Sequence, residues 1–209
     1  FMKYDYKRLY PIVLVLLMFV VYKYRDYQNT KFQLVEGETM GTTYHIKYIG
    51  RDNLKSEIDS ILIDFNNSVS TYIPESEISV FNQTGELNYK SKYFYPVISK
   101  ASEIYKNTNG AFDPTVMPLV NAWGFGFKNK ENIDSTLIDS LVKLVDFNAI
   151  SFDESKVSTS KKGVMLDFSA IAKGYGSDVI SNFLTSKKIY NYMVEIGGEV
   201  RVKGKNLEN

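Results

Sequence analysis

The sequence predicts an α+β fold, with mixed sheets and helices packed against them. Apolar residues recur at helical spacing in four segments, and shorter runs rich in β-branched and aromatic residues separate them. The order of these segments lacks the regular strand–helix–strand alternation of a parallel α/β protein, which favours an α+β arrangement.

Composition sets the outer limits on fold and function. With 209 residues, of which 44% are apolar and 23% charged, the chain can form one domain with a hydrophobic core. A net charge of +1 gives no global field for nucleic acid, so no nucleic-acid partner is expected. The absence of cysteine excludes disulfides, zinc–thiolate sites and thiol nucleophiles.

Residues 1–33 are predicted to form an N-terminal signal anchor and a linker, ahead of a folded domain over 34–209. Basic residues flank the apolar run 12–21, a pattern typical of an export signal. The run is shorter than the roughly 18 residues of a membrane span. Because no cleavage site or lipid-accepting cysteine follows, an uncleaved anchor is favoured over a cleaved signal or a buried first element. The expected location is the bacterial cell envelope, where the N-terminal segment would anchor the protein in the inner membrane and the domain would face the periplasm or the outside.

The elements of the domain follow from local patterns. A strand is predicted over 42–49 and a helix over 54–69, with Asp52 or Asn53 as its N-cap. Further helices are predicted over 94–108, with Gly110 as its C-cap, over 134–145 and over 170–186. Short strands are expected near 149–152 and 163–167, and a strand pair over 192–196 and 200–203 joined by Gly197-Gly198.

The segment 165–178 (MLDFSAIAKGYGSD) passes from an apolar strand through small residues into a helix. Backbone N–H groups at a helix N-terminus attract phosphate, and small residues allow close approach. Lys173 could neutralise a pyrophosphate, and Asp167 could hold a hydroxyl or ring nitrogen. An ordinary strand-to-helix junction capped by Ser169 is the alternative, and the pattern alone leaves both open.

The segment 110–126 (GAFDPTVMPLVNAWGFG) contains too many glycines and prolines for a long regular element. Its aromatic residues would be costly to leave in water. Either it covers the core, or it lines a pocket for a flat aromatic ligand.

Five motifs occur in order along the chain. They are Met40-Gly41-Thr42, Ser70-Thr71-Tyr72 with Ser76 to Ser79 and Asn82, Gly110 to Val116, Leu166 to Tyr175, and Ile196 to Val200. Together they resemble the FAD:protein FMN transferase family, of ApbE type, from about Gly37 to Lys205. This resemblance implies a domain that binds FAD in a cleft, uses Mg²⁺, transfers FMN to a threonine or serine hydroxyl of an acceptor protein and releases AMP.

The resemblance also implies roles for residues in the first half of the domain. Met40 would contact the flavin nucleotide, and Tyr72 would stack on or beside the isoalloxazine ring. Ala111, Phe112 and Asp113 would line the nucleotide site.

In the second half, Asp167 and Lys173 would hold polar groups of FAD, and Ala170 would give its backbone carbonyl to the metal. Gly197 and Gly198 match the family's paired glycines, where a backbone must approach closely.

The resemblance also sets a limit. Members of the family usually continue past the position of Asn209 with carboxylate and hydroxyl ligands for the metal and a histidine-containing segment. Residues 34–209 are therefore expected to be the N-terminal part of the transferase domain, with the catalytic residues beyond Asn209. His45, the only histidine, lies in no motif and is interpreted as an ordinary strand residue.

Two alternatives to transferase activity remain open from the sequence. One is a flavin-binding envelope protein that hydrolyses FAD, and the other is an inactive fragment of the transferase. Both would keep the same nucleotide-binding residues, so the motifs do not separate them.

Overall fold

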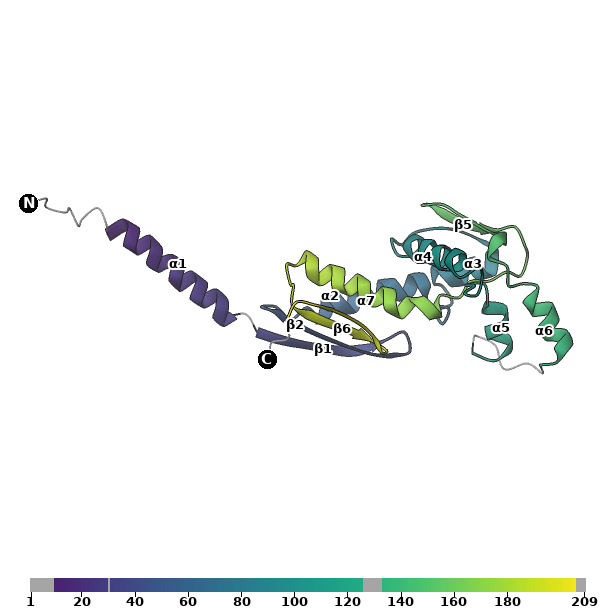
Figure 1. The fold of residues 1–209 in the computed structure, drawn as a ribbon, viewed down its shortest axis with the longest axis horizontal. Helices are drawn as coiled ribbons and strands as arrows, with labels where there is room; N and C mark the ends of the chain where they lie inside the picture. Colours follow the sequence, from purple (N-terminus) through teal and green to yellow (C-terminus); the bar gives the residue numbers. More distant parts are fainter. Residues whose placement is uncertain (1–9, 30, 126–132, 206–209) are drawn as a thin grey trace, which may run out of the picture.

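The computed structural model describes residues 10–29, 31–125 and 133–205. In Figure 1 a long N-terminal helix precedes a body in which sheets are packed by helices, as the α+β prediction requires. The body has two lobes, each with its own sheet and its own hydrophobic core.

The first lobe is built on an antiparallel sheet with the strand order β1-β2-β6-β7. Its strands are β1 (Lys31–Thr39), β2 (Thr42–Gly50), β6 (Tyr192–Ile196) and β7 (Glu199–Lys203). Side chains alternate between the two faces, and one face is buried through Val35, Tyr44, Ile46, Tyr48, Tyr192, Val194 and Ile196. Helices α2 (Lys55–Val69) and α7 (Ser169–Ser186) cover that face.

The second lobe contains a smaller antiparallel sheet with the order β3-β5-β4. Its strands are β3 (Glu86–Asn88), β4 (Ile150–Phe152) and β5 (Lys156–Thr159). The remaining helices are α3 (Glu77–Thr84), α4 (Phe94–Asn107), α5 (Met117–Ala122), α6 (Ser135–Val142) and the 3₁₀ turn η2 (Phe147–Ala149). Aromatic residues fill this core, where Phe94 and Phe168 meet edge to face with ring centroids 5.4 Å apart.

Helices α2 and α7 contribute to both cores. In α2, Ile58 and Leu62 belong to the first core, and Phe65 belongs to the second. In α7, Ile180 lies in the first core and Ala172 in the second. The two lobes therefore share two continuous helices.

Helix α1 (Tyr10–Asn29) extends away from the body (Figure 1). The side chains of residues 12–21 are 48–65% exposed, so the interpretation of this run as a buried first element is wrong. Residues 22–29 continue the helix and β1 begins at Lys31, where the sequence had predicted a linker. A helix with the length and apolar character needed to cross a membrane is not found among the described residues.

Most predicted elements of the domain are present. The helix predicted over 94–108 is α4, the one over 170–186 is α7, and the Gly197-Gly198 turn joins β6 to β7. Asn53 Oδ1 accepts from the Lys55 N–H (2.9 Å), although the N-cap residue itself is Leu54. The strand predicted over 163–167 reduces to one bridge between Met165 and Val116. The elements β1, β3, β5 and α5 were not assigned from the sequence.

Candidate nucleotide site

The β1–β2 turn, formed by Met40 and Gly41, marks one side of the candidate site. Both residues have positive φ (51° and 70°), the conformation of a two-residue hairpin turn that follows strand twist. The Met40 side chain packs against both hydrophobic cores. A Cβ atom on Gly176 of α7 would lie 2.8 Å from Met40 Cε, so the glycine lets Met40 lie against the helix.

The Gly197-Gly198 turn lies directly beside the β1–β2 turn. The Gly197 N–H donates to the Thr43 carbonyl (3.1 Å). A Cβ on Gly197 would lie 2.6 Å from Thr42 Cγ2 and 2.9 Å from Lys173 Cδ, which leaves no room for a side chain. The structure therefore brings together Met40, Lys173 and the paired glycines from three distant motifs.

A carboxylate fixes the Gly197-Gly198 turn from the outer face of the sheet. Glu195 accepts from the Gly198 N–H (2.5 Å) and bonds His45 Nδ1 (2.7 Å). The Gly198 N–H, and after it His45, lower the pKa of Glu195 below its ordinary value. His45 thus has a specific partner, and its Nε2 lies 3.7 Å from a carboxylate oxygen of Glu36.

The Asp113 carboxylate organises the loop that precedes α5. Its Oδ1 accepts from both the backbone N–H (2.8 Å) and the hydroxyl (2.5 Å) of Thr115. Its Oδ2 accepts from the Phe147 N–H (3.3 Å), while Thr115 Oγ1 accepts from the Asp146 N–H (2.8 Å). These bonds tie the loop to residues 146–147.

The segment leading to Asp167 is held from two sides. On one side the Asp167 N–H donates to the Pro114 carbonyl (2.7 Å), beside the Met165–Val116 bridge. On the other side the Asn82 side chain bonds both backbone groups of Leu166: Nδ2 donates to the carbonyl (2.8 Å), and Oδ1 accepts from the N–H (2.7 Å). Three motifs that are far apart in sequence therefore converge at Asp167.

Asp167 lies two residues before the start of helix α7. Its Oδ1 accepts from the N–H (2.8 Å) and hydroxyl (2.5 Å) of Ser169, the first residue of the helix. The N-cap residue is Phe168, and not Ser169 as in the junction interpretation. Ala170 is exposed in the first turn, and Lys173 follows three residues later. Helix α7 thereby connects Asp167 and Ala170 to the two turns near Met40.

Exposed aromatic residues form a further group. Tyr72 and Phe125 are 68% and 70% exposed, and the Tyr72 hydroxyl donates to the Phe125 carbonyl (2.9 Å). Trp123 is also exposed, whereas Phe112 packs against the second core and Met117 is buried, so the segment covers part of the core and leaves other aromatic side chains exposed. Ala111 is exposed. The last aromatic residue of this loop, Phe127, lies outside the described residues.

The described residues offer few ligands for a metal ion. No three His, Asp or Glu side chains within residues 10–29, 31–125 and 133–205 are arranged to hold one. Ala170 can offer its carbonyl, but the side-chain donors that Mg²⁺ prefers do not gather around it in this part of the chain.

Sequence reasoning missed Asn66 as well as the roles of Asn82 and Glu195. Asn66 Nδ2 donates to Thr39 Oγ1 (2.9 Å) beside Met40, and its buried Oδ1 has no hydrogen-bond partner among the described residues. A polar residue on the mostly apolar inner side of α2 was the signal that could have identified it.

Comparison with known proteins identifies a family that this chain resembles. The model of the ApbE family matches residues 40–209. An FAD:protein FMN transferase of Haemophilus influenzae is 39% identical over 197 residues, covering 87% of this chain and 57% of the relative. One of Vibrio cholerae is 39% identical over 184 residues, covering 83% and 55%.

Solved structures give the same result. Flavin transferase ApbE from Vibrio cholerae superposes with a TM-score of 0.80 at 36% identity, covering 86% of this chain and 61% of that one. The apo flavinyl transferase ApbE of Pseudomonas stutzeri gives 0.77 at 28% identity, covering 85% and 60%. The chain spans about 57% of the first of the curated relatives. With five ordered motifs, a family match over residues 40–209 and a shared fold, the chain belongs to the ApbE family.

Proposed function

We propose that the natural protein transfers FMN from FAD to a hydroxyl group of an acceptor protein. The observation that carries this proposal is the convergence of Met40, Lys173, Gly197-Gly198 and Asp167 around the N-terminal half of α7, in a chain whose relatives are named FAD:protein FMN transferases. In such a reaction the acceptor hydroxyl loses its proton as its oxygen forms a bond to the FMN phosphorus, the bond from that phosphorus to the AMP phosphate oxygen breaks, and AMP leaves.

The residues present suit the phosphates and the flavin of FAD. Lys173 and the N-terminus of α7 supply positive charge and backbone donors for a pyrophosphate. The glycines of the two turns, Gly41 and Gly198, have positive φ and no atom within 4 Å of where a Cβ would lie. A ligand could therefore approach the backbone closely there. Tyr72 offers an exposed aromatic face for a flat ring, and Asp113, with Ala111 and Phe112 beside it, shapes the loop opposite Asp167.

Dependence on Mg²⁺ is part of the proposal for the whole protein. Ala170 would contribute its carbonyl oxygen, and the side-chain ligands are not found in the described part of this chain.

The test is to incubate the natural protein with FAD, Mg²⁺ and a candidate acceptor protein. A mass increase of the acceptor equal to one FMN, with AMP released, supports transfer. Free FMN and AMP with an unmodified acceptor favour the alternative, an FAD hydrolase. Absence of any FAD-induced thermal stabilisation indicates an inactive chain and contradicts both.

A matched pair of variants tests Asp167 within this function. Asp167→Ala removes the group proposed to hold FAD and also both hydrogen bonds that Ser169 donates at the start of α7. Ser169→Ala removes one of the two hydrogen bonds and leaves the carboxylate in place. FAD affinity should fall about tenfold or more in the first variant and change little in the second. Equal effects would remove Asp167 from the nucleotide site.

The proposal extends to location. The protein is attached to the inner membrane, with its domain facing the periplasm. The exposed apolar side chains of residues 12–21 in α1, followed in the same helix by Lys23 and Arg25, support this attachment. Fractionation of cells and protease accessibility in spheroplasts would check both statements. Recovery of the protein in the soluble fraction would contradict the attachment.

A further inference from the structure

The end of the first sheet that lies nearest α1 is rich in exposed cationic side chains. We call it the cationic end, and it comprises Lys31, Lys47, Arg51, Lys187, Lys188, Lys203 and Lys205. By contrast, the net charge of the whole chain is only +1. Acidic residues near this end include Asp52, in the same turn as Arg51, and Glu57. On the outer face, Glu36 and Glu195 lie against His45, two residues along β2 from Lys47.

Strand register and contacts bring these cations to one place. Lys31 pairs with Gly50, next to Arg51, and Lys203 pairs with Tyr192, which in turn pairs with Tyr48. The Lys205 N–H donates to Asn191 Oδ1 (3.0 Å).

The two lysines that follow α7 reach the same end. They precede Ile189, whose Cδ1 would lie 3.4 Å from a Cβ on Gly50. The β1–β2 turn and the Gly197-Gly198 turn lie at the opposite end of the strands.

Apolar side chains lie between these lysines on the outer face of the sheet. A hollow of about 410 Å³ is lined there by Phe32, Ile49, Met193 and Val202, with Lys47, Lys203 and Lys205 among the residues around it. Phe32 and Val202 are both at least half exposed. The surface thus combines an apolar floor with cations at its margin.

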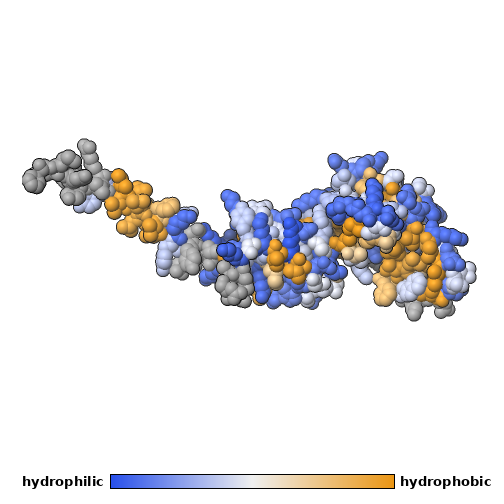
Figure 2. Space-filling model, in the orientation of Figure 1, coloured by the Kyte–Doolittle hydropathy of each residue, from blue (hydrophilic) through white to orange (hydrophobic). Residues whose placement is uncertain are grey.

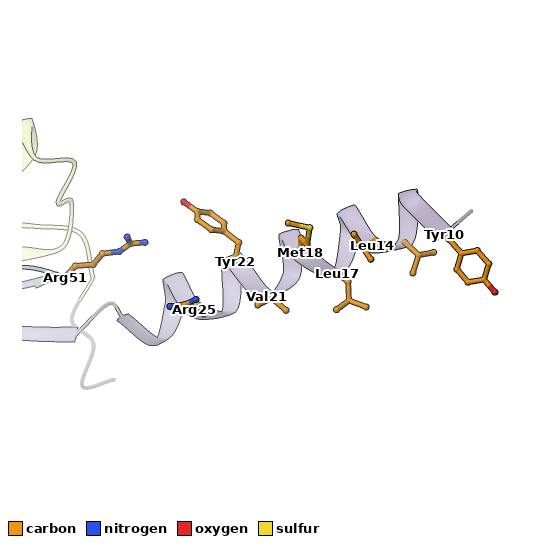
Figure 3. A pocket seen from close by; sticks show the side chains of 9 residues that line it. Tyr10, Leu14, Leu17, Met18, Val21, Tyr22, Arg25 and Arg51 are labelled. Carbon is orange, nitrogen blue, oxygen red and sulfur yellow. The ribbon is translucent and has the colours of Figure 1, made fainter. Parts of the chain in front are cut away.

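Helix α1 continues this surface. Figure 2 shows its apolar side chains exposed along the helix, and Figure 3 shows Arg51 extended from the body toward the Tyr22 and Arg25 end of α1. Arg51 and Arg25 line one hollow together with apolar residues of α1. Apolar groups followed by a band of cations are the two features that bind a peripheral segment to a lipid bilayer.

We propose that the cationic end is a docking surface for anionic phospholipid headgroups, with the apolar side chains of α1 inserted into the same bilayer. This inference rests on the proposed membrane attachment and names the lipid that the body itself contacts. Charge complementarity selects anionic lipid, because lysines clustered near a bilayer are attracted by its negative surface potential.

This docking would also orient the enzyme. At 3.3 Å per residue along β2, the Met40-Gly41 turn lies about 20 Å from Lys47 and about 30 Å from Gly50, next to Arg51. The candidate nucleotide site would face away from the lipid.

Binding of the natural protein to vesicles tests the proposal. Flotation compares vesicles of phosphatidylcholine alone with vesicles that contain about 30% phosphatidylglycerol, at about 0.1 M salt. The protein should bind the anionic vesicles at least about tenfold more tightly, since each lysine near such a surface strengthens binding by roughly fivefold.

A triple variant removes the charges that surround the hollow: Lys47→Gln, Lys203→Gln and Lys205→Gln. It should lose most of the preference for anionic vesicles and keep its binding to neutral ones. The matched control carries the same loss of charge on exposed lysines of the second lobe, Lys90→Gln, Lys106→Gln and Lys162→Gln, and should bind like the wild type.

The possible results distinguish lipid binding by the cationic end from membrane attachment through α1. Equal binding to neutral and anionic vesicles, or equal effects of the two triple variants, would overturn the docking surface and leave attachment through α1 intact. No binding to either vesicle would overturn both. A lipid-free dimer that the first triple variant dissociates, with no lipid preference, would show that this face binds a second copy instead.

Discussion

Asn82 provides the sharpest test of how the site is held together. Its side chain makes two hydrogen bonds to the backbone of Leu166, one residue before Asp167. Leu166 is fully buried, so Asn82→Ala leaves a buried N–H and a buried carbonyl without partners. Each such group costs about 1–3 kcal/mol. Because water can enter the vacated space, the expected loss in the free energy of unfolding is about 2–4 kcal/mol.

Urea unfolding of the natural protein, followed by far-UV circular dichroism, measures this loss. Asn82→Asp is the informative second variant, since it keeps the size and the acceptor but places a carboxylate against the Leu166 carbonyl. It should destabilise at least as much as alanine at about pH 7. The control is Asn88→Ala at an exposed position of β3, expected to change stability by less than about 0.5 kcal/mol. If both Asn82 variants lose less than about 1 kcal/mol at unchanged m-value, the two hydrogen bonds from Asn82 do not hold the Leu166 backbone in place.

Three other predictions concern the turns and the flavin face. Tyr72→Ala should weaken FAD binding and reduce quenching of flavin fluorescence, whereas Tyr72→Phe keeps the ring and should retain the quenching; unchanged quenching in the alanine variant excludes stacking. Gly197→Ala should lower the free energy of unfolding by about 1–3 kcal/mol, because its φ is 55° and its Cβ would lie 2.6 Å from Thr42 Cγ2. Gly198→Ala has positive φ but open space around it, so thermal unfolding should show a smaller loss; equal losses would contradict the crowding. The pKa of Glu195 is lowered in the fold, so its carboxylate stabilises the protein above its ordinary pKa of 4.5 and less as the pH falls through the lowered value. The difference in free energy of unfolding between wild type and Glu195→Gln should therefore shrink from about pH 7 to about pH 3 in urea titrations, and a constant difference would contradict the assignment.

The sequence was sufficient for the elements with strong local signals. Helix α4 has an apolar stripe with Pro96 in its first turn, and the β6–β7 hairpin has two glycines between two short apolar runs, so both were predicted nearly to the residue. Strand β1 was not predicted, because only Val35 and Thr39 are buried in it and its other residues are partly or fully exposed. Its pairing with β2 is a property of the sheet, which a local pattern does not contain.

The candidate site shows the same division. The small residues around Asp167 and Lys173 predicted a strand that leads into a helix, but the local pattern left an ordinary junction open, and the proposed FAD roles of both residues rest on the family resemblance. Asn82 was visible only as the end of a weak motif, since its partner Leu166 is 84 residues away. The role of Glu195 was likewise hidden, because its bond to His45 joins strands separated by 150 residues. Contacts of this range depend on tertiary pairing and leave no periodic trace in the sequence.

The sharing of α2 and α7 between the two cores has a consequence for cooperativity. Neither lobe can lose its packing without exposing one flank of both helices, so local opening of one lobe raises the free energy of the other. Amides at the centre of these helices should be among the slowest in the molecule to exchange with solvent. The residues of α7 that we propose to contact FAD lie at its N-terminal end, so binding of FAD should slow amide exchange in both lobes at once.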